Sequence, residues 1–154
     1  MKKLVSLLIA ACLASLFSAC ASGPEYATAA KSIPPLSPDN ARIYIYRTTV
    51  LGAVLKPTIT INDKEVGSST AQGFLYVDEP PGEYKISTST EVTRTLSLTL
   101  DKGQTRYVRC GVSMGFFVGH VYPELVENSV GEQEITSCKY TGVSPGGASS
   151  TGGN

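Results

Sequence analysis

Any catalytic chemistry that needs a histidine would have to use His120, because the chain has no other. A general base or a histidine-led triad needs such a residue beside a nucleophile or a carboxylate. His120 stands in the apolar stretch Val118-Gly119-His120-Val121-Tyr122, and no serine or cysteine has the sequence context of a nucleophile elbow. We therefore predict a packed or sheet-edge histidine and a protein that is not an enzyme.

Paired carboxylates are the other candidates for acid–base work. They occur as Asp78-Glu79 and as the spaced residues Glu124 and Glu127. Neighbours along a strand point to opposite faces, so Asp78 and Glu79 should not converge, and we interpret both pairs as solvated charge. The sequence has neither the ligand spacing of a zinc or calcium site nor a phosphate-binding glycine loop with its lysine. We predict no cofactor and no metal.

Cys20 ends a segment with the order of an export signal. Met1-Lys2-Lys3 is positive, Leu4 to Phe17 is apolar apart from two serines, and Ser18-Ala19 leads into Cys20. The apolar run has 14 residues, whereas a membrane-spanning helix needs about 20, so we expect cleavage. The segment resembles a bacterial lipobox, although Phe17 stands where that motif usually has leucine or another aliphatic residue. A plain secreted protein, cut near Ala19 or Ala21, is the alternative.

The lipobox resemblance implies that Cys20 is acylated and becomes the first mature residue. Several acyl chains on one residue give lasting membrane attachment. Ala21 and Ser22 follow the cysteine, and aspartate does not, which by the same resemblance implies transport to the outer membrane. We expect a lipid-anchored protein of the cell envelope that faces the periplasm.

The two remaining mature cysteines, Cys110 and Cys138, form an even pair. Cys12 would leave with the leader and Cys20 would carry lipid, so in an oxidising compartment we predict a disulfide between Cys110 and Cys138. A disulfide that closes the loop from Cys110 to Cys138 would stabilise the fold by roughly 3–4 kcal/mol. A redox pair or metal site is the alternative, but the Cys-x-x-Cys spacing is missing and too few histidines are present.

Four tyrosines could form an aromatic platform for a sugar or peptide: Tyr44, Tyr46, Tyr76 and Tyr84. The competing interpretation is that they serve as core residues and cross-strand pairs, which is the commoner use of aromatic residues in a β-domain.

Composition divides the chain into four parts. Residues 1–19 are the leader, and residues 20–40 begin with Cys20 and read as a proline-rich tether. Residues 41–141 are long enough for one compact domain, and residues 142–154 read as a disordered Gly/Ser tail. The formal net charge of the whole chain is zero, and no basic cluster follows the leader, which argues against a nucleic-acid partner.

Short runs of β-branched, aromatic or alternating residues predict seven or eight strands in the domain. The opening run, Arg42 to Arg47, has no polar alternation and suits a strand covered on both faces. The runs are 42–47, 57–61, 65–69, 73–77, 83–90, 95–100, 105–112 and 116–121. Turn signals every eight to twelve residues favour an all-β, mainly antiparallel sandwich or small barrel.

One short helix is expected near the C-terminus of the domain. Ser129-Val130-Gly131-Glu132 fits a capping box, and Ile135 and Cys138 are three residues apart, on one helical face. Gly131 in the first turn speaks against this helix.

The opening strand ARIYIYR, the hairpin ITINDKEVG and the turn-strand PPGEYKI follow one another in that order. Together they resemble a bacterial lipoprotein family of unassigned function, whose domain is similar to prealbumin-like β-sandwiches. The resemblance covers about Ala41 to Val108 and implies a fold rather than a chemistry.

These observations favour a non-enzymatic outer-membrane lipoprotein that acts as a binding or envelope-assembly module with an envelope protein as partner. The first alternative is an accessory subunit of a secretion or envelope machine. A less favoured alternative is an envelope hydrolase, which would need His120 in a cleft beside a carboxylate and a hydroxyl.

Overall fold

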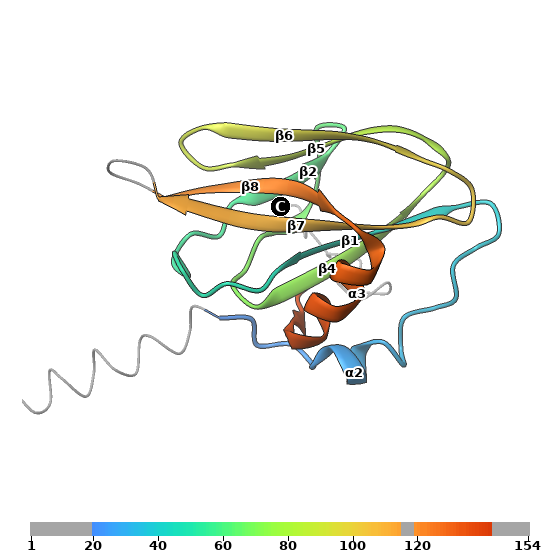
Figure 1. The fold of residues 1–154 in the computed structure, drawn as a ribbon, viewed down its shortest axis with the longest axis horizontal. Coiled ribbons are helices and arrows are strands. Elements are labelled where there is room, and N and C mark those ends of the chain that lie inside the picture. Colours follow the sequence, from blue (N-terminus) through green and yellow to red (C-terminus); the bar gives the residue numbers. More distant parts are fainter. Residues whose placement is uncertain (1–19, 115–118, 143–154) are drawn as a thin grey trace, which may run out of the picture.

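The computed structural model describes residues 20–114 and 119–142, which form two sheets packed face to face with a thin helical layer on one side (Figure 1). The five-stranded sheet contains, in order, β8 (Gly119–Val126), β7 (Thr105–Met114), β1 (Ala41–Arg47), β4 (Gly73–Glu79) and β9 (Lys139–Tyr140). The four-stranded sheet contains β3 (Lys64–Ser68), β2 (Thr58–Ile61), β5 (Gly82–Ser89) and β6 (Thr93–Leu100). The helical layer contains α2 (Tyr26–Ala29), α3 (Asn128–Glu134) and the 3-10 turn η1 (Ile135–Ser137).

The predicted all-β sandwich with one short C-terminal helix is confirmed. Most strand pairs are antiparallel, as expected, but β1 runs parallel to β7 and β4 runs parallel to β9. The tightest hairpin joins β2 to β3, where Asn62 and Asp63 both adopt positive φ (48° and 66°). Asparagine and aspartate tolerate that conformation better than other non-glycine residues, and it suits the twist of a two-residue hairpin.

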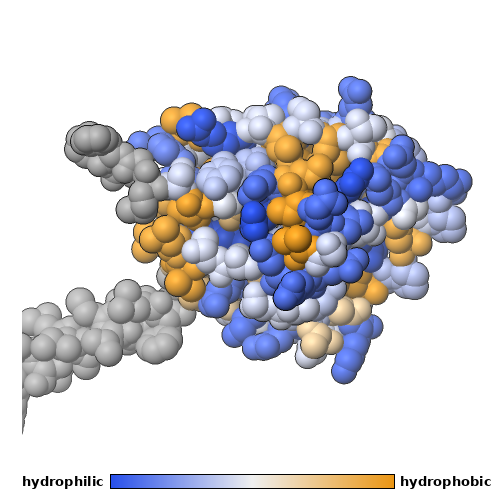
Figure 2. Space-filling model, in the orientation of Figure 1, coloured by the Kyte–Doolittle hydropathy of each residue, from blue (hydrophilic) through white to orange (hydrophobic). Residues whose placement is uncertain are grey.

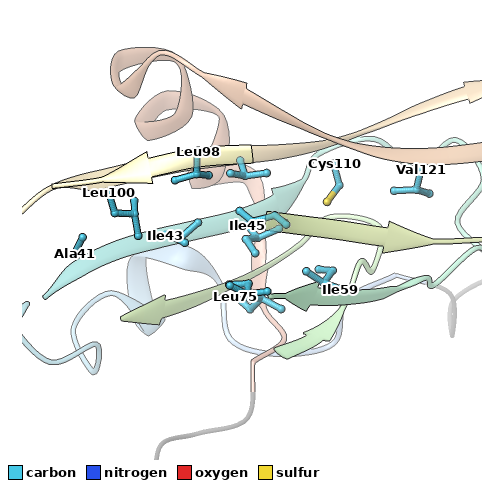
Figure 3. Close-up of a cluster of buried hydrophobic side chains, with 12 residues drawn as sticks. Ala41, Ile43, Ile45, Ile59, Leu75, Leu98, Leu100, Cys110 and Val121 are labelled. Atoms are coloured by element: carbon cyan, nitrogen blue, oxygen red, sulfur yellow. The ribbon is translucent and has the colours of Figure 1, made fainter. Parts of the chain in front are cut away.

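The main core fills the space between the sheets (Figure 3). Because side chains alternate along a strand, β1 directs Ile43 and Ile45 into this core. From the other sheet Ile59, Ile86 and Leu98 meet them. In the sequences of β2, β5 and β6, the alternation of apolar and polar residues therefore marks the side chains that face this core.

A second apolar cluster lies on the opposite face of the five-stranded sheet, beneath the helical layer. Its members are Ala29, Tyr44, Tyr46, Phe74, Tyr107, Ile135 and Cys138. β1 contributes to both clusters, so all seven of its residues are buried. This explains why its sequence lacks polar alternation and confirms the prediction of a strand covered on both faces.

Helix α3 packs closely on this face through Gly131. A Cβ atom at Gly131 would lie 2.3 Å from Tyr107, so the helix can approach the sheet only with glycine here. The expected capping box is wrong, because the helix begins at Asn128 after Glu127 and no side chain caps it.

The predicted disulfide between Cys110 and Cys138 is not present, and both thiols are free and buried. Cys110 on β7 points into the core between the sheets, whereas Cys138 belongs to the cluster under the helical layer. The Cys138 thiol instead contacts the carbonyl oxygen of Arg47 at 3.7 Å. The five-stranded sheet lies between the two sulfurs, and the spacing of the two cysteines along the chain could not reveal this.

The expected proline-rich tether is also wrong for the first part of residues 20–40, which packs against the domain. Cys20 forms a β-bridge with Ala71, and Glu25 forms one with Lys139. The Tyr26 amide donates to the Cys138 carbonyl at 3.0 Å, and Ala29 is buried. The leader, residues 1–19, and the tail beyond Gly142 lie outside the described residues, as does the first part of the expected strand 116–121.

Candidate functional site

A cavity of about 190 Å³ lies between the N-terminal segment and the outer face of strands β4 and β9. Two tyrosine rings form one wall, and small or aliphatic residues of the N-terminal segment form the other. Its lining residues are Pro24, Thr28, Ala29, Ser32, Ile33, Tyr76 and Tyr140.

Strand geometry places the two tyrosines. On β4, Leu75 points into the main core, so its neighbour Tyr76 must point outward, towards the N-terminal segment. Tyr140 reaches the same face from β9, and the Tyr76 and Tyr140 ring centroids are 6.1 Å apart. The N-terminal segment is held opposite them, because the Tyr140 amide donates to the Pro24 carbonyl at 2.8 Å.

Arg42 supports Tyr76 from the side. Its guanidinium carbon lies 4.7 Å from the Tyr76 ring centroid, within the range of a cation–π contact. The cross-strand partner Asp78 accepts from Arg42 Nε at 2.6 Å and from Nη2 at 2.7 Å, which raises the pKa of Arg42. The Pro34 carbonyl accepts a third bond from Arg42, at 2.9 Å. Arg42 therefore positions both the Tyr76 ring and the backbone at Pro34.

The cavity is suited to an apolar group with some hydrogen-bonding capacity at its rim. Burial raises the pKa of the Tyr76 and Tyr140 phenols, so both hydroxyls stay protonated at physiological pH. Thr28 and Ser32 add aliphatic hydroxyls. The cavity is smaller than typical small-molecule sites of about 300–1,000 Å³, and a single side chain or ring would fill it.

The predicted tyrosine platform does not exist as one surface. Tyr76 alone of the four lines the cavity. Tyr44 and Tyr46 are buried under the helical layer, where Tyr44 stacks on Tyr107 with ring centroids 5.2 Å apart. Tyr84 lies on β5 in the other sheet and donates to the Pro80 carbonyl. For Tyr44 and Tyr46 the core interpretation is the correct one.

Tyr140 is the aromatic lining residue that the sequence patterns did not predict, and the lining residues of the N-terminal segment were not predicted as site residues either. Tyr140 lies in a two-residue strand, which is too short to produce a period-two pattern. Its position directly after the predicted helix was the only signal available.

One carboxylate of each candidate pair, Asp78 and Glu124, forms an ion pair that holds elements together. Asp78 binds Arg42, as described above, and Glu124 accepts from Arg109 at 3.0 Å. Arg109 also donates to Glu134 of α3 at 2.8 Å, and the Tyr46 hydroxyl donates to the same carboxylate at 2.6 Å. This cluster joins α3 to β1, β7 and β8, which is a structural use of charge.

His120 lies on β8, half-buried and opposite Ser113 of β7. Its Nδ1 atom is buried without a hydrogen-bond partner, and among the described residues no carboxylate forms an ion pair with it. Within residues 20–114 and 119–142, no three histidine, cysteine, aspartate or glutamate side chains are grouped so that they could hold a metal ion. In the same part of the chain, no helix is long and apolar enough to span a membrane.

The fold and cavity define a β-sandwich with a helical layer and a small apolar site at one sheet edge. The chain belongs to the family described as "Protein of unknown function (DUF2846)", whose match spans residues 37–121. It is also similar to an "Uncharacterized protein" of Haemophilus influenzae, with 33% identity over 129 residues that cover 80% of this chain and 77% of that protein.

The family match and the cavity overlap only in part. The match runs from just before β1 into the beginning of β8. Of the lining residues it includes Tyr76, whereas Tyr140 and the N-terminal wall lie outside it.

Proposed function

We propose that this protein is a non-enzymatic lipoprotein of the outer membrane that faces the periplasm and binds an envelope protein through the cavity between Tyr76 and Tyr140. The alternative within the same class is an accessory subunit of a secretion or envelope machine. Both assign a protein partner to a lipid-anchored β-sandwich.

The anchor is supported by the pattern of residues 1–20, in which a positive start, an apolar run and two small residues precede Cys20. The pattern resembles a lipobox. Cys20 is half-buried and borders a surface hollow, so it lies at the boundary of the domain rather than in its core.

The observation that carries the binding role is the composition of the cavity. Two tyrosine rings, Ile33 and Ala29 offer apolar contact, while the polar groups at the site are hydroxyls. The lining side chains supply four hydroxyls and no amide or charged group, which are few partners for the many sugar hydroxyls that binding would desolvate, and burying an unpaired hydroxyl is costly. A branched or aromatic side chain of a protein partner matches the cavity better.

The proposal can be tested by photo-crosslinking in intact cells. A photoreactive amino acid replaces Ser32, which is exposed and lines the cavity, and in a control chain it replaces Lys64, which is exposed on the edge strand β3 of the other sheet. We expect one defined protein adduct from position 32 and none from position 64. Adding Tyr140→Ala should reduce that adduct about tenfold or more, because loss of an aromatic anchor costs about 2 kcal/mol of binding.

Two outcomes would count against the proposal. The first is the same adduct from both positions, or an adduct that Tyr140→Ala leaves unchanged. The second is an absence of adducts together with a melting temperature that rises with glycan fragments, which would favour sugar binding. The identity of the captured protein separates a general assembly role from a subunit of one machine.

The less favoured alternative, an envelope hydrolase, requires His120 to act with a carboxylate and a hydroxyl. Ser113 is its cross-strand neighbour, but the described residues supply no carboxylate partner, so the geometry gives this alternative less support than the cavity gives a binding role.

A further inference from the structure

Four of the exposed large apolar side chains belong to two loops of the sandwich. Val54 is 83% exposed, Val50 56% and Leu51 49%, all in the loop between β1 and β2, and Val92, in the turn between β5 and β6, is 44% exposed. Exposed apolar side chains that gather at one end of a molecule mark an interaction site. Figure 2 shows hydrophobic surface gathered on the edge of the described molecule that lies beside the grey N-terminal trace.

Strand register places both loops at the same end of the molecule. β2 begins at Thr58, which pairs with Ser89, the last residue of β5. The Thr88 hydroxyl donates to the Val121 carbonyl at 2.8 Å, which ties the end of β5 to the beginning of β8. The loop from β1 to β2 and the turn from β5 to β6 therefore lie at the same end of the sandwich.

Cys20 lies at this end as well. Arg47, the last residue of β1, pairs with Gly73, and Cys20 bridges to Ala71 just before it. In Figure 1 the described chain begins at the same side of the molecule as the loop between β1 and β2. We call the surface formed by Cys20, Val50, Leu51, Val54 and Val92 the apolar end.

The loop that carries three of these side chains is held in place from below. Arg47 is fully buried, and its guanidinium donates to the carbonyls of Leu55 at 2.9 Å, Gly52 at 2.8 Å and Leu51. The three carbonyls fix the loop against Arg47, because the guanidinium charge would otherwise be buried without these partners. The apolar side chains therefore project outward from a fixed loop.

We propose that the apolar end rests on the lipid bilayer, with Val50, Leu51 and Val54 in the interfacial region beside the acyl chains of Cys20. The inference depends on the proposed lipidation. Because the segment after Cys20 is packed on the domain and is not a spacer, acyl chains on that residue would hold this end of the domain at the membrane surface. Interfacial apolar residues enter about 5–10 Å into the boundary between headgroups and chains.

The charges around the apolar end agree with this orientation. Lys56 lines the same surface hollow as Cys20, so in this orientation it would lie near the lipid headgroups. Glu91 neighbours Val92 in sequence, so the turn between β5 and β6 should remain at the rim while the loop between β1 and β2 enters more deeply.

The chain has no tryptophan, which allows a direct test by fluorescence. Val54→Trp places one reporter at the apolar end. Val130→Trp is the matched control, since Val130 is an exposed valine (39%) on α3, which packs near Tyr107 towards the other end of β7. The lipidated full chains are reconstituted into phosphatidylethanolamine–phosphatidylglycerol vesicles with either ordinary or brominated acyl chains. Leu51→Trp serves as a second reporter if Val54→Trp folds poorly.

We expect Val54→Trp to show blue-shifted emission and to lose most of its fluorescence in brominated vesicles, while Val130→Trp does neither. Equal, weak quenching of the two variants would overturn the proposal and show that the domain stands clear of the membrane. A blue shift without quenching would also overturn it, because the apolar end would then be covered by protein. Mass spectrometry first verifies lipid on Cys20 in each sample, so that a missing lipid counts against the proposed function and an unquenched reporter counts against the docking.

Discussion

The five-stranded sheet keeps the two buried cysteines of the domain apart. Cys110 and Cys138 lie on opposite faces of the five-stranded sheet, and neither thiol has a disulfide partner. Burial raises the pKa of both thiols to about 11. The thiolate is the reactive form, so both cysteines should be inert in the folded protein.

This placement predicts the behaviour of the two thiols. Without reductant, and with Cys20 lipidated as we propose, the mature chain should show two free thiols in denaturant, and neither should react at pH 8 while the protein is folded. Titration with a thiol-reactive chromophore measures the number of reactive thiols in denaturant and in the folded protein. An absence of free thiols in denaturant would indicate a disulfide and would contradict the placement of the two cysteines.

The same pKa shifts set a pH dependence. The folded state holds each thiol proton more tightly than the unfolded chain, whose thiols ionise near pH 9, so stability should be lost as the pH rises from about 9 to about 11. The variant Cys110→Ala/Cys138→Ala should lose less stability over this interval, as measured by urea unfolding at each pH. Buried tyrosines such as Tyr46 and Tyr107, whose pKa values are also raised, account for the loss that remains.

At the scale of elements, α3 depends on one close contact rather than on its helical propensity. The helix has seven residues and no side-chain cap, so it would be marginal in isolation. Gly131 against Tyr107, and Glu134 with Arg109 and Tyr46, attach it to the sheet. Packing therefore makes this helix, and glycine, which weakens helices in isolation, is required here.

Replacing Gly131 by alanine should have two opposing effects on the stability of the protein. The measured change in stability shows which effect is larger. Helix propensity alone would favour alanine by about 1 kcal/mol. The new Cβ would overlap the buried Tyr107 side chain, and overpacking costs about 1–3 kcal/mol, so we expect a net loss of stability. Urea unfolding measures the change, with Val130→Ala, at an exposed position of the same helix, as a control that should shift stability by no more than about 0.5 kcal/mol. A raised melting temperature for Gly131→Ala would contradict the close packing.

At the scale of the whole molecule, the N-terminal segment belongs to the domain and completes both the cavity and the apolar end. Pro24, Thr28 and Ile33 form the wall opposite Tyr76 and Tyr140. Cys20 lies at the edge of the same body. An anchor at this residue would couple membrane attachment directly to the orientation of the sandwich.

The proposed anchor predicts a difference in fractionation. The wild-type chain should remain with membranes at high salt, because acyl chains hold by apolar burial, whereas Cys20→Ala should be released and should lack the lipid mass at its N-terminus. Cys110→Ala, which alters a thiol buried between the sheets, should stay with the membranes. Retention of Cys20→Ala at high salt would rule out lipid at this residue as the anchor.

Local patterns in the sequence determined the strands, several turns and the fold class. Alternation in runs such as residues 95–100 follows from the period of a strand, which is a property of the backbone itself. The covered strand Ala41–Arg47 was also predictable, because a strand buried on both faces excludes polar alternation. The order of charge, apolar run and small residues before Cys20 is likewise local, and supports the proposed anchor without reference to the fold.

Tertiary structure alone decided what those elements bring together. Whether Cys110 meets Cys138, or Tyr44 meets Tyr76 at a surface, depends on which face each residue occupies and on what covers that face. The prolines of residues 20–40 suggested a spacer, yet bonds from residues near Ala71 and Cys138 hold the segment on the domain. These contacts join residues far apart in the chain, so no local pattern encodes them, and the cavity and the apolar end exist only once the sheets have packed.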